Sequence, residues 1–336
     1  MSQPSPSRDL RELPKAQLHL HLTGAMRPAT LAELAGRYGI VVPPPLPTAA
    51  GTWGAFQDRY DASRTALRTP ADIQRVIVEA ATDDAADGCG WLEIQVDPTS
   101  YAPVFGGLEP ALEAVLAGAA AAPIPVGVLV ASSWRRSPSH AVTLARLAAR
   151  YAGDGVVGFG LSNDERGASV ADFAPAFTLA RDAGLLAAPH SGFYTPATHV
   201  RDCVELLGAS RIGHGTSAAT DPVVVELLAS RGVALEICPT SYPPFGVHEL
   251  SAIPVTTFLA AGVPIAVSTD DPLLFGVGLA GQYEILRSSL GLTDEDLATI
   301  AAGGIQASAA PPAEKSRLLA EVTAWLDTPA SNLCDD

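Results

Sequence analysis

Two histidines one residue apart stand near the N-terminus, in the stretch Gln-Leu-His-Leu-His-Leu at residues 17–22. The leucines alternate with polar residues, which is the period-two pattern of a half-buried β-strand. In a strand, His19 and His21 lie on one face, about 6.5 to 7 Å apart. Two imidazoles in this arrangement can chelate a metal ion, although a half-buried strand with two incidental histidines gives the same pattern.

Composition narrows the class of partner. The 336 residues carry a net charge of −15 and an isoelectric point near 4.8, and 48% of them are hydrophobic. The acidic balance argues against a nucleic acid or an anionic membrane surface, so we expect a small-molecule partner. We found no signal peptide and no apolar run long enough to span a membrane, which predicts a cytoplasmic protein. The cysteines are scattered and are expected to be reduced: Cys89, Cys203, Cys238 and Cys334.

Eight short apolar runs alternate with helical patterns, the order typical of a parallel sheet built from βα units. The runs cover residues 17–22, 91–97, 124–131, 156–161, 185–188, 211–214, 233–238 and 264–268. We predict an α/β fold, a (β/α)8 TIM barrel in one domain over residues 1–336. It has a helical insertion at residues 29–86 after the first strand and flexible ends at 1–13 and 328–336. A doubly wound open sheet is the alternative, but the glycine-rich nucleotide-binding motifs of such sheets are absent.

In such a barrel the active site lies at the C-terminal ends of the strands. His19 and His21 end the first predicted strand, and His190 follows the fifth. Asp270 and Asp271 follow the eighth. Three imidazoles and a carboxylate suit a divalent transition metal, most simply zinc, with a position left for water. The other histidines fall in predicted helices or loops and are interpreted as surface or structural: His140, His199 and His248.

A base must accompany such a metal. Zinc lowers the pKa of bound water to about 7, and an imidazole titrates in the range needed to take the proton. His214 ends the sixth predicted strand between two glycines, which allow close approach; a buried structural histidine is the alternative. Neither lysine, Lys15 or Lys315, ends a predicted strand. A carboxylated lysine bridging two metals is therefore not available, and we expect one zinc ion per chain.

Five motifs extend this pattern along the chain. They are Pro-Lys-Ala-Gln-Leu-His-Leu-His-Leu-Thr-Gly at 14–24, His-Ser-Gly at 190–192, Arg-Ile-Gly-His-Gly at 211–215, Glu-Ile-Cys-Pro-Thr-Ser at 236–241 and Ser-Thr-Asp-Asp-Pro at 268–272. In this order they resemble the motifs of the adenosine deaminase family of the amidohydrolase superfamily. The resemblance implies a zinc-bearing barrel that hydrolytically removes the 6-amino group of a purine. A weaker similarity at 271–276 and 281–284 suggests the branch that includes 6-aminodeoxyfutalosine deaminases.

The resemblance also implies roles for single residues. His214 would orient and deprotonate the water, and Asp271 would bind the purine, typically at N7. The loop Gly-Leu-Ser-Asn-Asp-Glu at 160–165 would contact the purine and places Asn163 near its edge. The metal would be held by four ligands: His19, His21, His190 and Asp270.

Three positions depart from the family pattern. The family motif after strand five is His-Ala-Gly-Glu, and its glutamate donates a proton to purine N1, whereas Phe193 stands there in this chain. Phe193 cannot act as an acid; it can stack on a substrate, close a pocket or simply pack the loop. Thr23 replaces an aspartate that contacts the ribose in adenosine-specific members, and Asn163 replaces a glycine. We count all three among the candidate substrate-binding residues.

Three functions remain open at this point. The first is a zinc-dependent hydrolytic deaminase of a purine nucleoside or a related amino-heterocycle, possibly 6-aminodeoxyfutalosine. The second is a catalytically weakened relative that binds a ligand, and the third is a metal-dependent hydrolase of a non-purine substrate, since a fold does not determine a substrate. The presence of both His214 and Asp271 favours the first.

Overall fold

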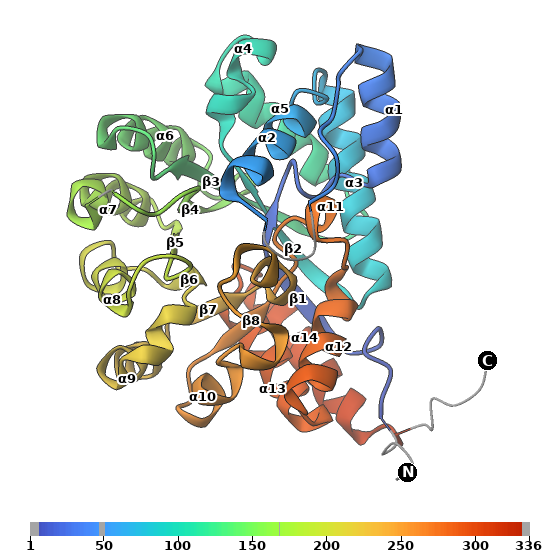
Figure 1. The fold of residues 1–336 in the computed structure, drawn as a ribbon, viewed down its shortest axis with the longest axis vertical. Coiled ribbons are helices and arrows are strands. Elements are labelled where there is room, and N and C mark those ends of the chain that lie inside the picture. The colour runs from blue at the N-terminus through green and yellow to red at the C-terminus, as the bar shows by residue number, and fades with distance from the viewer. Residues whose placement is uncertain (1–6, 47–50, 168, 331–336) are drawn as a thin grey trace.

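The computed structural model describes residues 7–46, 51–167 and 169–330. Within these residues, eight parallel strands pair in the order β1 to β8 and form a nearly closed barrel with helices around it (Figure 1). The predicted (β/α)8 TIM barrel is thus confirmed. The strands are β1 (Lys15–His21), β2 (Cys89–Val96), β3 (Val126–Ser133), β4 (Val156–Ser162), β5 (Leu186–Ser191), β6 (Arg211–His214), β7 (Ala234–Ile237) and β8 (Ile265–Val267).

The helices lie between and beyond the strands. The α-helices are α1 (Pro28–Tyr38), α2 (Trp53–Arg64), α3 (Pro70–Ala86), α4 (Ala102–Phe105), α5 (Leu108–Ala120), α6 (Pro138–Arg150), α7 (Ala174–Asp182), α8 (Ala197–Leu206), α9 (Pro222–Arg231), α10 (Val255–Ala260), α11 (Pro272–Phe275), α12 (Leu279–Leu290), α13 (Asp294–Ala307) and α14 (Pro312–Asp327). The 3-10 helices are η1 (Pro98–Ser100), η2 (Val170–Phe173), η3 (Thr216–Thr220), η4 (Pro239–Ser241), η5 (Pro243–Phe245) and η6 (Leu250–Ala252).

The helix ends follow local sequence signals. Asp221 accepts a hydrogen bond from the backbone N–H of Val223 and starts α9, which ends at Gly232 in the left-handed conformation. Thr293 and Asp296 form a capping box at the start of α13. Both ends agree with the sequence patterns, because the caps satisfy backbone groups that a helix end leaves without partners.

The strand ends differ from the prediction by a few residues, and one difference concerns the site. Strand β5 continues to Ser191, so His190 lies within the strand and not after it. The reason is pairing with β6, since His190 is in register with Gly213 and Ser191 with His214. The barrel closes beside the site, where the backbone N–H of His21 donates to the carbonyl of Asp270 (3.1 Å).

The predicted helical insertion consists of α1 and α2, followed by α3. Helix α3 packs on β2 and α5 as a barrel helix does. Helix α2 turns Trp53, Phe56, Tyr60 and Arg64 toward the cavity at the C-terminal ends of the strands. The insertion therefore builds part of the site as well as covering the barrel.

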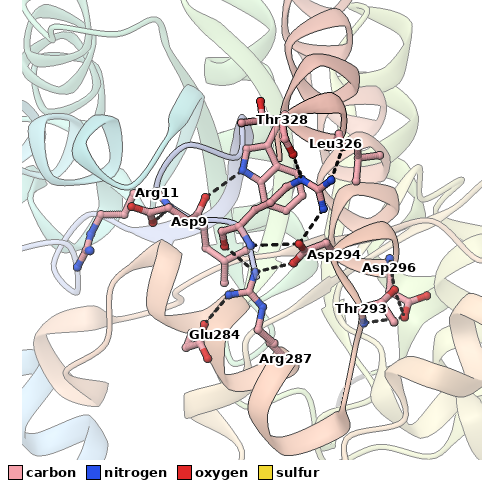
Figure 2. Close-up of polar contacts among 12 residues, drawn as sticks. Asp9, Arg11, Glu284, Arg287, Thr293, Asp294, Asp296, Leu326 and Thr328 are labelled. Atoms are coloured by element: carbon pink, nitrogen blue, oxygen red, sulfur yellow. Dashed lines mark hydrogen bonds and ion pairs between the residues drawn. The ribbon is translucent and has the colours of Figure 1, made fainter. Parts of the chain in front are cut away.

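The N-terminal segment is bound to the last helices, as Figure 2 shows. Arg8 forms an ion pair with Asp294 of α13 (3.0 Å) and donates to the carbonyls of Leu326 and Thr328. Asp294 also pairs with Arg287 of α12 (2.8 Å). These contacts hold the described start of the chain, residues 7–13, against the C-terminal helices, while the flexibility proposed for the ends stays a prediction.

Two further expectations concern cysteines and membranes. Cys89, Cys203 and Cys238 are buried and carry free thiols, whereas Cys334 lies outside the described residues. None of the helices in the described ranges is both long and apolar enough to cross a membrane.

Substituting Asp294 tests the contact between the chain ends. Asp294→Asn keeps the size of the side chain but removes the charge shared by Arg8 and Arg287, whose side chains are only 18% and 15% exposed. We expect the free energy of unfolding to fall by about 1.5–3 kcal/mol, the range for hydrogen bonds to charged groups. Chemical unfolding of the purified protein measures the change.

The matched control is Glu321→Gln in α14, which removes a charge from the half-exposed Arg317–Glu321 pair. An exposed pair contributes little, so a change within about 0.5 kcal/mol is expected. Equal losses in the two variants would show that Asp294 has no special structural role.

Candidate active site

Four predicted ligands meet at the C-terminal end of the barrel. His19 and His21 come from β1, His190 from β5, and Asp270 follows β8. The Nε2 atoms of His19 and His21 lie 3.5 and 3.4 Å from Oδ1 of Asp270. Nε2 of His190 lies 3.2 Å from Nε2 of His21. The four predicted ligands are thus neighbours at this rim. Groups of three whose ligand atoms all lie within 4.8 Å of one another include His19, His190 and His214, and also His21, Asp270 and Asp271.

His19 is oriented by a chain of buried charges. Its Nδ1 lies 2.7 Å from Oε2 of Glu236, and because a carboxylate only accepts, Nδ1 carries the proton. Glu236 also accepts a hydrogen bond from Arg211 (2.7 Å), which pairs with Glu93. All four side chains are fully buried. Nε2 of His19 therefore points away from Glu236 and has no hydrogen-bond partner among the described residues. Once the ring is neutral this nitrogen can bind a metal, the arrangement that carboxylates impose on metal-binding histidines.

The charges around the cluster favour a cation at this point. Burial lowers the pKa of His19, but Asp270 and Glu236 on either side outweigh it and raise the pKa to about 10. Burial also favours the neutral form of Asp270, yet His19 and His21 hold its pKa well below the usual range. In the chain without metal a proton on His19 supplies the positive charge, and a metal ion at the same place would replace it.

The donor set fits a zinc ion. Imidazole nitrogens and a carboxylate oxygen are common zinc ligands, and His19 provides an unpartnered nitrogen aimed at the cluster. The thiol of Cys238 also lies near His19 and Asp270. However, burial and then the charge of Asp270 raise the pKa of this thiol well above its usual value, so Cys238 stays protonated and is a poor ligand.

His214 lies beside the cluster, where the sequence placed the base. Its ring centroid is 5.0 Å from that of His19, and its Nε2 is 3.9 Å from Asp270. A Cβ atom on Gly213 would lie 2.9 Å from the ring of His19, which confirms that glycine permits this close approach. Burial lowers the pKa of His214 to about 3, partly offset by Asp270, so its imidazole is neutral at pH 7.

The backbone at the site is strained. Among the described residues, the non-glycine residues with positive φ are Asn163 (72°), His214 (65°) and Asp270 (61°), and all three line the same cavity. Such left-handed conformations cost free energy for residues with a Cβ atom and cluster at functional sites. The strained backbone therefore identifies these three residues as candidate functional residues, independently of their side-chain chemistry.

Asp271 is buried next to Asp270, and its Oδ1 has no hydrogen-bond partner. A Cβ atom on Gly24 would lie 1.8 Å from this oxygen, so the glycine after Thr23 makes room for the carboxyl group. Burial and then the charge of Asp270 raise the pKa of Asp271 well above its usual value. The raised pKa favours the protonated carboxyl group, which can donate a hydrogen bond.

A cavity of about 220 Å³ opens in front of these residues. Phe193 lines it and packs against His214, with ring centroids 4.7 Å apart. Phe245 lies 5.7 Å from Phe193 and 5.3 Å from Phe56, so the rings form one continuous wall. We define the aromatic wall as Trp53, Phe56, Phe193, Tyr194, Phe245 and Phe275.

Two other predicted substrate contacts lie differently. Asn163 lines the cavity and donates to Gln57 of α2 (3.4 Å). Thr23 is fully buried, and its hydroxyl is 2.7 Å from that of Tyr101. Tyr101, and not Thr23, lines the cavity. A direct substrate contact of Thr23 stays a prediction.

The remaining histidines and lysines lie away from the metal ligands. His140 hydrogen-bonds with Thr99 (2.7 Å), and His199 with the hydroxyl of Ser191 (2.7 Å). Lys15 begins β1, at the opposite end of the strand from His21, and donates to carbonyls that include that of Asp87 (2.8 Å). Lys315 lies in α14. Neither lysine reaches the site.

Sequence reasoning missed residues that the fold brings to the site. Glu93 and Glu236 received no role, although a charged residue inside an apolar strand is a recognisable signal because it must be paired when buried. Gln95 and Tyr101 were also missed. The aromatic residues of α2 carried no signal, because their position over the barrel depends on how the insertion folds.

The fold and the site place the chain among (β/α)8 barrels with a candidate metal centre at the C-terminal rim. The chain belongs to the adenosine deaminase family, whose model matches residues 14–325. The resemblance seen in the motifs is therefore confirmed.

Relatives with curated names and solved structures cover nearly the whole chain. A Streptomyces coelicolor protein whose name proposes an adenosine/adenine deaminase is 52% identical, over 95% of this chain and 98% of that protein. An aminodeoxyfutalosine deaminase of the same organism is 33% identical, over 96% of this chain and 89% of that protein. The crystal structure of an adenine deaminase from Arthrobacter aurescens matches with a TM-score of 0.84 and 28% identity. The match covers 96% of this chain and 100% of that protein.

Metal content tests the ligand set. Elemental analysis of the purified wild-type protein should find close to one equivalent of zinc or a similar ion. If Asp270 is a ligand, Asp270→Ala should lose most of this metal. Asp271→Asn is the matched control, because it alters the adjacent buried carboxyl group but not a proposed ligand, and it should keep the metal. Loss of metal in both variants, or in neither, would contradict the assignment.

Proposed function

We propose that this protein is a zinc-dependent hydrolytic deaminase that removes the amino group of a purine nucleoside or a related 6-amino-heterocycle. The observation that carries the proposal is the cavity in which His214 and Asp271 stand beside the neighbouring side chains of His19, His21, His190 and Asp270. Membership of the adenosine deaminase family supports the reaction type. The names of relatives include adenine, adenosine/adenine and aminodeoxyfutalosine deaminases, and this variety leaves the substrate to experiment.

His19, His21, His190 and Asp270 would hold the zinc ion. When bound, such an ion lowers the pKa of water and stabilises negative charge, so that a nucleophile is available at neutral pH. Glu236 supports this role by fixing the tautomer of His19 through the 2.7 Å hydrogen bond.

His214 would take the proton from the attacking water. Its imidazole is neutral at pH 7 and thus able to accept a proton. Asp270 lies 3.9 Å from Nε2 and would stabilise the imidazolium that forms. The left-handed backbone and the close packing against His19 hold the ring in place.

Asp271 would orient the purine. N7 of a purine carries no proton and can only accept a hydrogen bond, so the protein must supply a donor. The raised pKa of Asp271 favours the protonated carboxyl group, and Asp271 lines the cavity. The buried carboxyl group therefore suits N7 in its neutral form.

The proton for purine N1 lacks an obvious donor, because Phe193 stands where the family has glutamate. Glu165, in the loop after β4, is an alternative because it lines the cavity and contacts the loop after β5. One of its oxygens accepts hydrogen bonds from the backbone of Tyr194 (2.6 Å) and Thr195 (2.8 Å), and the other is buried without a partner. The same feature favours a second possible function, a relative that binds a purine and turns it over slowly.

Removing the base separates catalysis from metal binding. Ammonia release should be screened with adenine, adenosine, adenosine monophosphate and 6-aminodeoxyfutalosine. On any substrate that wild type deaminates, His214→Ala should lower turnover by about 100-fold or more, because it removes the proton acceptor, while zinc content stays near the wild-type value.

The matched control is His140→Ala in α6, which removes a histidine bonded to Thr99 outside the cavity lining and should keep activity. Turnover that survives in His214→Ala places the base elsewhere. Combined loss of zinc and activity would make His214 a ligand.

Restoring the acid tests the consequence of Phe193. Attack at C6 builds negative charge in the ring, and protonation of N1 relieves it. We expect wild-type deamination of adenine nucleosides to be at least ~100-fold slower than that of Phe193→Glu, the lower end of what a positioned acid contributes. Steady-state rates of ammonia release measure the ratio.

Phe193→Gln is the control, because it opens the aromatic wall to the same extent without adding an acid. A gain shared by both variants would assign the effect to space and not to the proton. Brisk wild-type turnover would point to another donor, with Glu165 as the first residue to test. No gain on any purine would favour a non-purine substrate.

A further inference from the structure

Gln95 is a buried residue of β2 at the edge of the candidate active site. It is in register with His21 of β1, and its carbonyl accepts a hydrogen bond from Leu22 (3.0 Å). Its side chain is 3% exposed, and it lines the cavity. Gln95 therefore stands beside a proposed metal ligand but cannot act as a ligand of the same kind.

Both polar atoms of the Gln95 side chain, Oε1 and Nε2, are buried without a hydrogen-bond partner. The other fully buried glutamines differ. Gln17 bonds to the hydroxyl and the backbone N–H of Thr269 (2.7 and 3.2 Å), and Gln282 does the same with Thr240 (2.7 and 3.2 Å). An unpaired buried amide is costly, so the unpaired donor and acceptor of this cavity-lining residue indicate a ligand that supplies both.

The position of Gln95 on the barrel decides which part of a purine it meets. In an eight-stranded ring, the ends of β1 and β2 lie across from those of β5 and β6. Phe193 follows β5 and faces the N1 side of the purine in the proposed function, while Asp271 after β8 faces N7. The opposite side of the ring, which carries N9 and its substituent, is then directed toward β2.

The cavity continues past Gln95 into polar surroundings. Its lining there comes from the ends of β2 and β3, unlike the aromatic wall on the other side. These residues suit a hydroxylated group: Asp97, Ser100, Tyr101, Ser133 and Arg136.

We propose that Gln95 binds the sugar of a purine nucleoside, its amide pairing with the two neighbouring ribose hydroxyls. This inference rests on the proposed function and makes it more specific, since it selects a nucleoside over a free base. Each hydroxyl both donates and accepts, so a vicinal pair satisfies Oε1 and Nε2 together. A free base has only the N3 and N9–H edge to offer, and the experiment separates the two.

Binding of the deamination products tests the proposal without turnover. Isothermal titration of the zinc-loaded protein with inosine and with hypoxanthine should compare wild type with Gln95→Met, which keeps the shape of the side chain. We expect inosine to bind at least ~10-fold more weakly to the variant, as for loss of a buried hydrogen-bonding group. Hypoxanthine should change less than about twofold, and zinc content should be unchanged.

Wild-type protein alone provides a second measurement should the variant fail to fold. Inosine should bind at least ~10-fold more tightly than 2′,3′-dideoxyinosine, which lacks the hydroxyl pair. Equal binding of these two, or equal loss for inosine and hypoxanthine in Gln95→Met, would overturn the assignment of Gln95 to the sugar. Absence of inosine and hypoxanthine binding together with no ammonia release from any of the four screened substrates would instead overturn the proposed function, and the inference with it.

Discussion

The chain of buried charges from His19 through Glu236 and Arg211 to Glu93 is the interaction on which the rest of the site depends. Buried charges are tolerated only when they are paired and hydrogen-bonded. Arg211 can neutralise only one of its two glutamates, and Asp270 adds a further negative charge beside His19. Three carboxylates against one guanidinium leave two negative charges, of which a proton on His19 would balance one and a divalent metal ion at His19 both.

The barrel makes this arrangement possible because parallel strands end at the same rim. Residues far apart in the chain meet there. They pack so closely that at some positions no side chain larger than that of glycine fits. Gly213 leaves space for the imidazoles of His19 and His190, and Gly24 leaves space for the carboxyl group of Asp271. Strain at His214 and Asp270 accompanies the same crowding, and the packed surroundings hold both residues in their unusual conformations.

The cavity combines two chemical characters that meet at the proposed metal centre. The aromatic wall includes Phe193, whose ring packs on that of His214, and its apolar surface favours stacking of a flat ring. The opposite side is polar and contains Gln95. A substrate with a flat heterocycle and a hydroxylated substituent matches both sides.

The sequence by itself determined the barrel, the ligand candidates and the family, because strand alternation and short motifs are local patterns. His19, His21, His190, His214, Asp270 and Asp271 were all found from their places at the ends of apolar runs. Only the tertiary structure decided which side chains support them. The pairing of Arg211 with Glu93 and Glu236, the contact of Thr23 with Tyr101 and the unpartnered amide of Gln95 join residues from different strands and loops. No local pattern encodes such contacts, since they depend on the register of the barrel and on the packing of the insertion over its rim.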